Sequence, residues 1–111
     1  MRLIEQVIDE QTHLIAVVGE LERGGGNRLV GRIDALDVAG DDHVVLDLTD
    51  MSFIDSTGLS NVISAWLTVT RGYGRFTLVV PDDGRSRRIF EITGLFQYLT
   101  LVGTRDQALA G

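Results

Sequence analysis

The sequence predicts an α/β fold, in which a small mixed β-sheet is flanked by helices. Two short, β-branched apolar runs, residues 13–19 and 44–48, are typical of buried strands. A long amphipathic helix pattern follows the second run, and strand and helix patterns alternate from there on. A length of 111 residues is typical of one domain, so we expect a single domain over residues 1–111.

The chain begins with two predicted strands and a predicted loop. Residues 3–8 are apolar apart from two polar positions, which favours an edge strand, and residues 13–19 form the first buried strand. Residues 24–26 are three consecutive glycines. Because glycine loses more backbone entropy than any other residue on entering a helix or strand, we expect a loop there.

A helix is predicted over residues 27–39, with Asn27 as its N-cap and Gly40 just past its end. Three apolar residues recur at helical spacing and form one face of this helix: Leu29, Ile33 and Leu36. The buried strand 44–48 comes next, and the polar stretch 49–52 then leads to the segment Phe53–Leu59.

The strongest helix pattern covers residues 57–71 and ends at Gly72. Its face consists of Leu59, Val62, Ile63, Trp66, Leu67 and Thr70. The remaining predicted elements are a strand over 75–80, a helix over 83–93, a strand over 98–102 and a helical turn over 104–110. In the helix 83–93 we expect Ile89 and Phe90 to face inward, with Ile92 as a further candidate. The predicted order is therefore β-β-α-β-α-β-α-β-α, with the strands after the first pair mostly parallel.

Composition excludes several classes of function. The net charge is −6, and residues 1–56 carry 12 acidic residues against 4 arginines. Without a basic stripe, the chain is a poor candidate for binding nucleic acid, and its acidic half favours a basic protein partner. The chain contains no cysteine, and His13 and His43 are too few for a confident zinc site. No apolar run is long enough to span a membrane and no signal peptide is evident, so we expect a cytoplasmic protein.

The segment Asp55-Ser56-Thr57-Gly58 allows two interpretations that do not exclude each other. An Asp-Ser pair before a periodic apolar helix is typical of an N-cap. Ser56 is also a candidate phosphoacceptor, because the free N–H groups and the dipole at a helix N-terminus tolerate a phosphate. That phosphate would add negative charge beside Asp55 and would spoil a surface that fits the neutral hydroxyl.

Other sites are less well supported by the sequence. A serine hydrolase would need a nucleophile elbow, but Ile54 stands where its first glycine belongs, and both histidines lie at strand starts. A nucleotide-binding or NTPase domain is disfavoured because the glycines 24–26 lack the lysine of a phosphate-binding loop. The acidic pairs at 41–42 and 82–83 are interpreted as turn residues rather than metal ligands.

Three segments resemble the STAS family, and specifically its bacterial anti-sigma factor antagonists. Residues 44–59, Val-Val-Leu-Asp-Leu-Thr-Asp-Met-Ser-Phe-Ile-Asp-Ser-Thr-Gly-Leu, resemble the family signature of an apolar strand, a short loop and Asp-Ser-Ser/Thr-Gly-Leu opening a helix. Residues 19–22 resemble its Gly-x-Leu-Asp, with Glu22 at the acidic position. Residues 88–95 resemble its third helix and Gly-Leu turn.

The resemblance implies an antagonist that binds an anti-sigma factor with serine kinase activity and so frees the sigma factor. The kinase phosphorylates Ser56 and releases the antagonist, and a serine phosphatase restores it. The family's binding surface maps to Glu22, Asp55, Ser56, Thr57, Gly58 and Leu59. The resemblance implies no catalysis, cofactor or metal of the antagonist's own. Similar domains also serve as accessory subunits of lipid-transport ATPases or join other signalling assemblies, and this alternative stays open.

Overall fold

The computed structural model describes residues 1–21, 23–81 and 85–110, without the side chains of 23–27, 85, 86 and 96. The strands are β1 (Arg2–Val7), β2 (Thr12–Leu21), β3 (His43–Asp47), β4 (Met51–Ile54), β5 (Arg75–Val79) and β6 (Thr100–Val102). The helices are α1 (Arg23–Ala35), α2 (Ser56–Arg71), α3 (Arg85–Ile92) and α4 (Arg105–Ala110), with a 3₁₀ turn, η1 (Leu95–Gln97).

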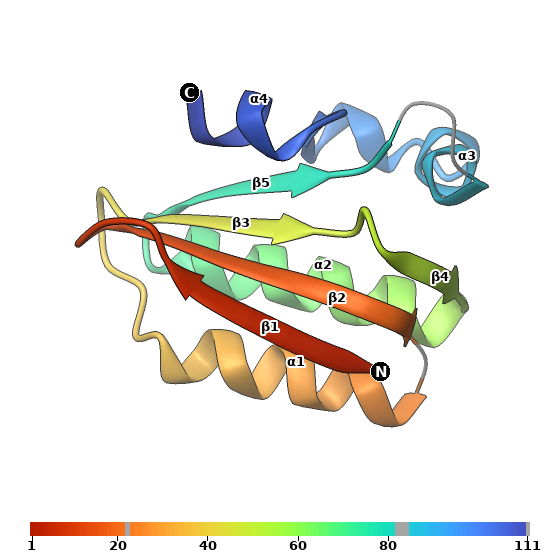
Figure 1. Cartoon of the computed structure of the whole chain (residues 1–111), viewed down its shortest axis with the longest axis horizontal. Coiled ribbons are helices and arrows are strands. Elements are labelled where there is room, and N and C mark those ends of the chain that lie inside the picture. Colours follow the sequence, from red (N-terminus) through yellow and green to blue (C-terminus); the bar gives the residue numbers. More distant parts are fainter. Residues whose placement is uncertain (22, 82–84, 111) are drawn as a thin grey trace.

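The sheet is mixed, with the order β1-β2-β3-β5-β6 (Figure 1). β1 is the antiparallel edge strand and pairs with β2 from Arg2↔Val18 to Val7↔His13. The pairs β2–β3, β3–β5 and β5–β6 are all parallel, and β4 pairs in parallel with the far end of β2. The predicted small mixed sheet, its antiparallel edge strand and its parallel remainder are therefore confirmed.

The two faces of the sheet are covered unequally. α1 and α2 lie side by side across one face, and the short α4 lies over β3 and β5 on the other (Figure 1). The main apolar core fills the space under α1 and α2 and includes Leu29 and Ile33 of α1 with Val62 and Val69 of α2. A smaller cluster lies under α4, where Ala108 contacts the sheet. The predicted face of α1 is buried at Leu29 and Ile33. On α2, Leu59 and Val62 are buried as predicted, but Ala65 and Val69 are buried in place of Ile63, Trp66, Leu67 and Thr70, which are half-buried, so the inward face is rotated from the predicted one.

Both ends of α1 differ from the prediction. The three glycines at 24–26 belong to the helix, which begins at Arg23 and not at Asn27. The buried side chains of Leu29 and Ile33 hold α1 against the core, and such packing outweighs a low helix propensity. The helix ends at Ala35 instead of continuing to residue 39, because Asp37 adopts a left-handed conformation at φ 49°.

The segment after β3 also differs from the prediction. Residues 49–52 were expected to be a polar connection, but Met51 begins the short strand β4. The pairing of β4 with β2 changes register between Gly19 and Glu20. Gly19 has a φ of 95° there, so the end of β2 bends toward β4.

The C-terminal part differs in two further respects. Residues 95–97 form a 3₁₀ turn, and β6 begins at Thr100, two residues later than the predicted strand 98–102. Ile92, a candidate for an inward position, is exposed.

Candidate functional site

Asp55 caps the N-terminus of α2. Its backbone is extended, at φ −101° and ψ −178°, and its Oδ1 accepts a hydrogen bond from the N–H of Gly58 at 2.6 Å. Its carbonyl oxygen accepts from the N–H of Leu59 at 2.9 Å. A carboxylate in this place satisfies a free donor of the first turn and lies at the positive end of the helix dipole. The capping role suggested for the Asp-Ser pair belongs to Asp55.

Ser56 is the first residue of α2, and its side chain is exposed. Its hydroxyl makes no hydrogen bond to the described part of the chain, because Asp55 already occupies the capping position. Thr57 is exposed beside it. The N–H groups of these two residues, which belong to the first turn of the helix, also donate to none of the described residues.

Gly58 and Leu59 lie inside the molecule rather than on its surface. A Cβ at Gly58 would stand 2.1 Å from the Leu21 carbonyl oxygen and 3.1 Å from Cγ1 of Ile54. Only a glycine therefore lets the first turn of α2 approach the end of β2 this closely. Leu59 is buried in the main core. These two residues fix the position of the segment, and Asp55, Ser56 and Thr57 are the ones that reach solvent.

The site lies at the carboxyl ends of the parallel strands. β2 ends at Leu21 beside Ile54 of β4, and Ser56 begins α2 two residues later, at the right-hand end of the molecule in Figure 1. Crevices outside the carboxyl ends of parallel strands are the usual ligand and partner sites of open α/β sheets. The segment around Ser56 occupies such a position, with β4 as an added element between β3 and α2.

Large apolar side chains are exposed on the elements next to Ser56. Phe53, on β4, is half exposed, and Ile92, on α3, is about three-quarters exposed at 73%. α3 packs against β4, so both side chains belong to the same end of the molecule (Figure 1). The sequence analysis considered Ile92 only as an inward-facing residue and assigned no role to Phe53. Both side chains are large apolar groups open to solvent at the end of the molecule that carries Ser56.

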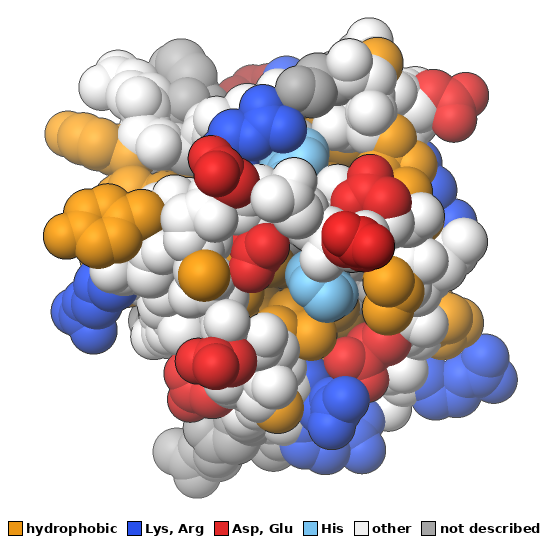
Figure 2. All heavy atoms as spheres, turned by 90° about the vertical axis from the view of Figure 1, so that its left-hand side faces the viewer, with side chains coloured by type: hydrophobic (Ala, Val, Ile, Leu, Met, Phe, Trp, Pro, Cys, Tyr) orange, Lys and Arg blue, Asp and Glu red, His pale blue; other side chains and the backbone are white. Residues whose placement is uncertain are grey.

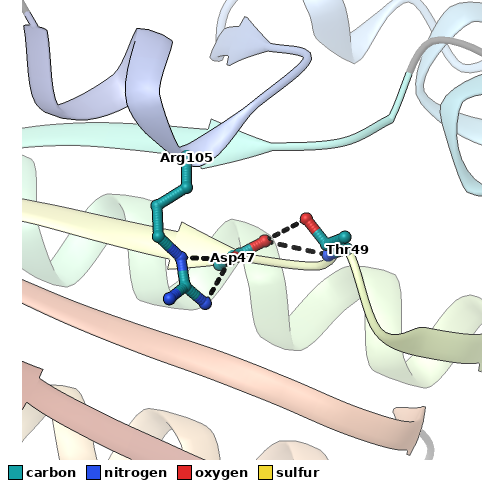
Figure 3. A network of polar contacts seen from close by, with 3 residues as sticks. All are labelled: Asp47, Thr49 and Arg105. Carbon is teal, nitrogen blue, oxygen red and sulfur yellow. Dashed lines mark hydrogen bonds and ion pairs between the residues drawn. The ribbon is translucent and has the colours of Figure 1, made fainter.

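A buried carboxylate, also missed in the sequence, fixes α4 to the end of β3 (Figure 3). Asp47 is 3% exposed, and the guanidinium of Arg105 donates to its Oδ2 from Nε at 2.9 Å and from a terminal nitrogen at 2.7 Å. The N–H and hydroxyl of Thr49 donate to its Oδ1. Burial alone would raise the pKa of Asp47, but these hydrogen bonds and the charge of Arg105 outweigh burial and hold that pKa below its usual value. A lone acid within the apolar run 44–48 was the available signal.

The family follows from a comparison with known protein families, in which the model for the STAS domain matches residues 1–108. The chain belongs to the STAS domain family. The match covers β1 through most of α4, including the whole of the segment around Ser56.

Solved structures share the fold of this STAS domain. An anti-sigma factor antagonist from Mycobacterium paratuberculosis superposes with a TM-score of 0.80 at 23% identity, covering 98% of this chain and 91% of that one. The anti-sigma factor antagonist SpoIIAA in its unphosphorylated form gives 0.73 at 17% identity, covering 98% and 94%. The Bacillus cell fate determinant SpoIIAA in its phosphorylated form gives 0.71 at 19% identity, covering 98% and 97%.

The two histidines of this STAS domain lie away from Ser56, at the amino ends of the parallel strands. Figure 2 looks onto that end and shows acidic side chains around the histidines. His43 begins β3, is buried, and contacts the Thr77 hydroxyl through Nε2 at 2.8 Å and the Arg75 guanidinium through Nδ1 at 3.2 Å. Neither histidine is placed to act as a base for Ser56, which agrees with the low rank given to a hydrolase.

The acidic residues of the first half of the chain lie at both ends of the parallel strands. Five of its acids lie in the turns at the amino ends of the parallel strands: Asp9, Glu10, Asp37, Asp41 and Asp42. Asp42 accepts from the N–H of Ala39, which is a turn role as expected. At the carboxyl ends lie Glu20, Asp50 and Asp55, together with Asp47, which is paired with Arg105, so only part of the acidic excess is on the side of Ser56.

The remaining predictions concern Glu22, the acidic pair at 82–83, a metal site and a membrane-spanning helix. Glu22 and the acidic pair at 82–83 lie outside the described residues. Within the described part of the chain, no group of three or more His, Asp or Glu side chains is arranged to hold a metal ion. None of the described helices is long and apolar enough to cross a membrane.

Proposed function

We propose that this STAS domain is an anti-sigma factor antagonist that binds an anti-sigma factor with serine kinase activity and is switched off by phosphorylation of Ser56. One observation carries the proposal: the Ser56 hydroxyl is exposed and unbonded to the described residues because Asp55 caps the helix. The hydroxyl is therefore accessible to a kinase. The likeness to SpoIIAA, solved in unphosphorylated and phosphorylated forms, supports the same function.

The geometry around Ser56 suits a reversible phosphate. The N–H groups of Ser56 and Thr57 make no hydrogen bond to the described residues, and the N-terminus of a helix attracts an anion, so the fold accepts the group. The phosphate adds about −1.5 to −2 charges on a surface that already carries Asp55. A partner surface fitted to a neutral hydroxyl would then meet both bulk and charge, and the complex would dissociate.

The residues have different roles in the proposed complex. Asp55, Ser56 and Thr57 contact the anti-sigma factor, Glu22 contributes an acidic side chain, and Gly58 and Leu59 hold the segment in position. The antagonist performs no catalysis in the cytoplasm: ATP and Mg²⁺ belong to the kinase, and a separate serine phosphatase restores the hydroxyl. The exposed Phe53 beside this segment supplies apolar contact area.

Phosphorylation by the cognate anti-sigma kinase tests the proposal. Incubation of the whole chain with kinase and ATP is expected to add one phosphate, and peptide mapping by mass spectrometry is expected to place it on Ser56. Ser56→Ala should abolish the label, and Thr57→Ala, the matched control with the neighbouring exposed hydroxyl removed, should keep it. A label on Thr57 or Ser52 with Ser56 unmodified would contradict the assignment.

The alternative, an accessory subunit of a lipid-transport ATPase or another assembly, predicts a different outcome. The chain would then co-purify with a transport ATPase, and Ser56→Ala would not alter its partner. A neighbouring gene for a histidine-kinase-like ATPase and a sigma factor favours the antagonist, whereas neighbouring permease and ATPase genes favour the accessory subunit.

A further inference from the structure

A groove of about 520 Å³ lies between the edge strand β1 and the helix α1. From the strand it is lined by Met1, Arg2, Leu3 and Glu5, and from the helix by Arg28, Gly31 and Arg32. Gly31 and Arg32 lie three and four positions after Arg28, so each of them neighbours Arg28 on the surface of α1. The volume falls within the range of about 300–1,000 Å³ that is usual for small-molecule sites. This groove shares no residue with the Ser56 segment.

The groove is basic although the chain as a whole is acidic. Two arginine side chains of α1, Arg28 and Arg32, line it against a single glutamate, whereas the position of Arg2 on β1 places its side chain on the opposite face of the sheet. Arg32 is already paired, because its Nε and a terminal nitrogen donate to the two carboxylate oxygens of Glu5 at 2.8 and 3.1 Å. The remaining positive charge is therefore carried by Arg28.

Arg28 has no carboxylate partner among the described residues. It donates from one terminal nitrogen to the carbonyl oxygen of Met1 at 2.6 Å, which orients its guanidinium. A guanidinium presents five N–H donors in a planar fork that matches the oxygens of a carboxylate or phosphate. An anionic group entering the groove would be bound by an arginine already held in place.

The strand side of the groove is apolar and the helix side is open. Met1 and Leu3 are half-buried and pack against the main core. At Gly31, a Cβ would meet no atom within 4 Å, so the middle of the helix face leaves space that side chains fill elsewhere on α1. The groove thus combines a positively charged side chain, which can bind an anionic group, with an apolar wall and space beside Gly31 for the rest of a ligand.

We propose that this groove binds a small amphipathic anion, with a carboxylate or phosphate head on Arg28 and an apolar body along Leu3 and Gly31. The charge of the groove selects for an anion, and the apolar wall selects against a purely hydrophilic one. The proposal does not depend on phosphorylation of Ser56 or on the anti-sigma partner.

Titration of the whole chain with four probes below their micelle concentrations tests the site, with amide NMR shifts and calorimetry as readouts. Dodecanoate and dodecyl phosphate represent the two head groups. Dodecyltrimethylammonium has the same tail with a cationic head, and inorganic phosphate has a head without a tail.

At least one of the two anionic amphiphiles is expected to bind saturably at one site and to shift the amides of Leu3 and Gly31. The stronger of the two identifies the head group. The cationic amphiphile and inorganic phosphate should bind at least about tenfold more weakly.

Two variants and one control complete the test. Arg28→Ala should lower the affinity for the anionic amphiphile about tenfold or more, because the variant loses a charge-assisted hydrogen bond to the head group. Gly31→Leu should fill the groove and abolish binding while the protein stays folded, because a side chain at this position meets open space. Arg71→Ala, an exposed arginine at the far end of α2, should leave the affinity unchanged.

Three results would overturn the proposal. These are no saturable binding of either anionic amphiphile, equal affinity for the cationic amphiphile, and unchanged affinity in both Arg28→Ala and Gly31→Leu. The second and third results would show that the tail binds to apolar surface without using the groove.

Discussion

Arg105 and Asp47 are 58 positions apart in the sequence and form an ion pair, with nitrogen–oxygen distances of 2.9 and 2.7 Å. The pair joins the first residue of α4 to the last residue of β3. α4 has only six residues and contributes a single fully buried side chain, Ala108, to the smaller apolar cluster. A helix of this length has little stability of its own, so its tertiary contacts must hold it in place.

Removing the arginine should therefore destabilise the fold. Arg105→Ala leaves the buried Asp47 carboxylate with Thr49 as its remaining partner, and we expect a loss of about 1–3 kcal/mol in the free energy of unfolding. Urea unfolding followed by circular dichroism measures this change. Arg88→Ala, which removes an exposed arginine from α3, is the control and should stay within about 0.5 kcal/mol of the wild type. Equal effects of the two substitutions would contradict the structural role of the pair.

The lowered pKa of the buried His43 predicts that the stability of the fold depends on pH. Burial lowers the pKa of His43 below its usual 6.5, and the neighbouring Arg75 lowers it further, with a smaller opposing effect from Asp9. Below pH 6.5 the unfolded chain binds a proton at this histidine more readily than the folded protein does. The neutral imidazole of His43 therefore contributes to the stability of the fold above pH 6.5. This contribution is lost as the pH falls from 6.5 toward the pKa of His43 in the folded protein.

Urea midpoints measured between about pH 7.5 and about pH 5.5 check this dependence. The wild type should lose stability over this interval by at most about 1.4 kcal/mol per pH unit from this group. His43→Gln, which cannot titrate, should show a shallower slope whatever its absolute stability. If the two slopes are the same, His43 is not responsible for the change.

Most of the fold could be predicted because its signals are local. The period of α2 and the β-branched runs of β2 and β3 are visible within a few residues, and they matched the structure closely. The start of α1 and the existence of β4 depend on partners far along the chain. Glycines 24–26 are helical because Leu29 and Ile33 pack into the core, and Met51–Ile54 is a strand because the end of β2 bends toward it.

The candidate site was predictable as a segment but not in the roles of its members. The Asp-Ser-Thr-Gly pattern indicated an N-terminus of a helix, and α2 does begin at Ser56. Which side chain caps the helix depends on a backbone conformation that spacing alone does not give. That Gly58 is needed for close approach depends on Leu21, which lies 37 positions earlier in the chain. The distribution of charge around the site likewise depends on the topology.

The close approach at Gly58 predicts opposite effects for two identical substitutions in two helices. Gly58→Ala puts a methyl group against the Leu21 carbonyl, so the N-terminus of α2 must move, at a cost of about 1–3 kcal/mol in stability. Gly31→Ala places the same methyl group in open space on α1 and should stabilise the protein by about 0.5–1 kcal/mol. Thermal unfolding of both variants measures the difference. A Gly58→Ala protein as stable as the wild type would refute the close contact.

The assignment of the cap predicts a second contrast, between adjacent residues. Asp55→Ala removes the acceptor for the Gly58 N–H and should cost about 1 kcal/mol. Ser56→Ala removes an exposed hydroxyl with no bond to the described residues and should change stability by less than about 0.5 kcal/mol. Chemical unfolding of the two variants under the same conditions decides between them. If Ser56→Ala were the more destabilising change, Ser56 would be the cap.

Ser56→Asp should separate folding from binding. A carboxylate at the first helical position is favoured by the helix dipole, so the variant should unfold at about the wild-type denaturant concentration. In the proposed complex the same carboxylate meets a partner surface that fits a hydroxyl beside Asp55, and it adds charge and bulk where a phosphate would stand. We expect at least a tenfold weaker affinity for the anti-sigma factor, a loss of about 1.4 kcal/mol, while Ser56→Ala binds like the wild type. Titration calorimetry of the three proteins against the anti-sigma factor measures this difference. Equal affinities of Ser56→Asp and Ser56→Ala would reduce Ser56 to a structural position and would favour the accessory-subunit alternative.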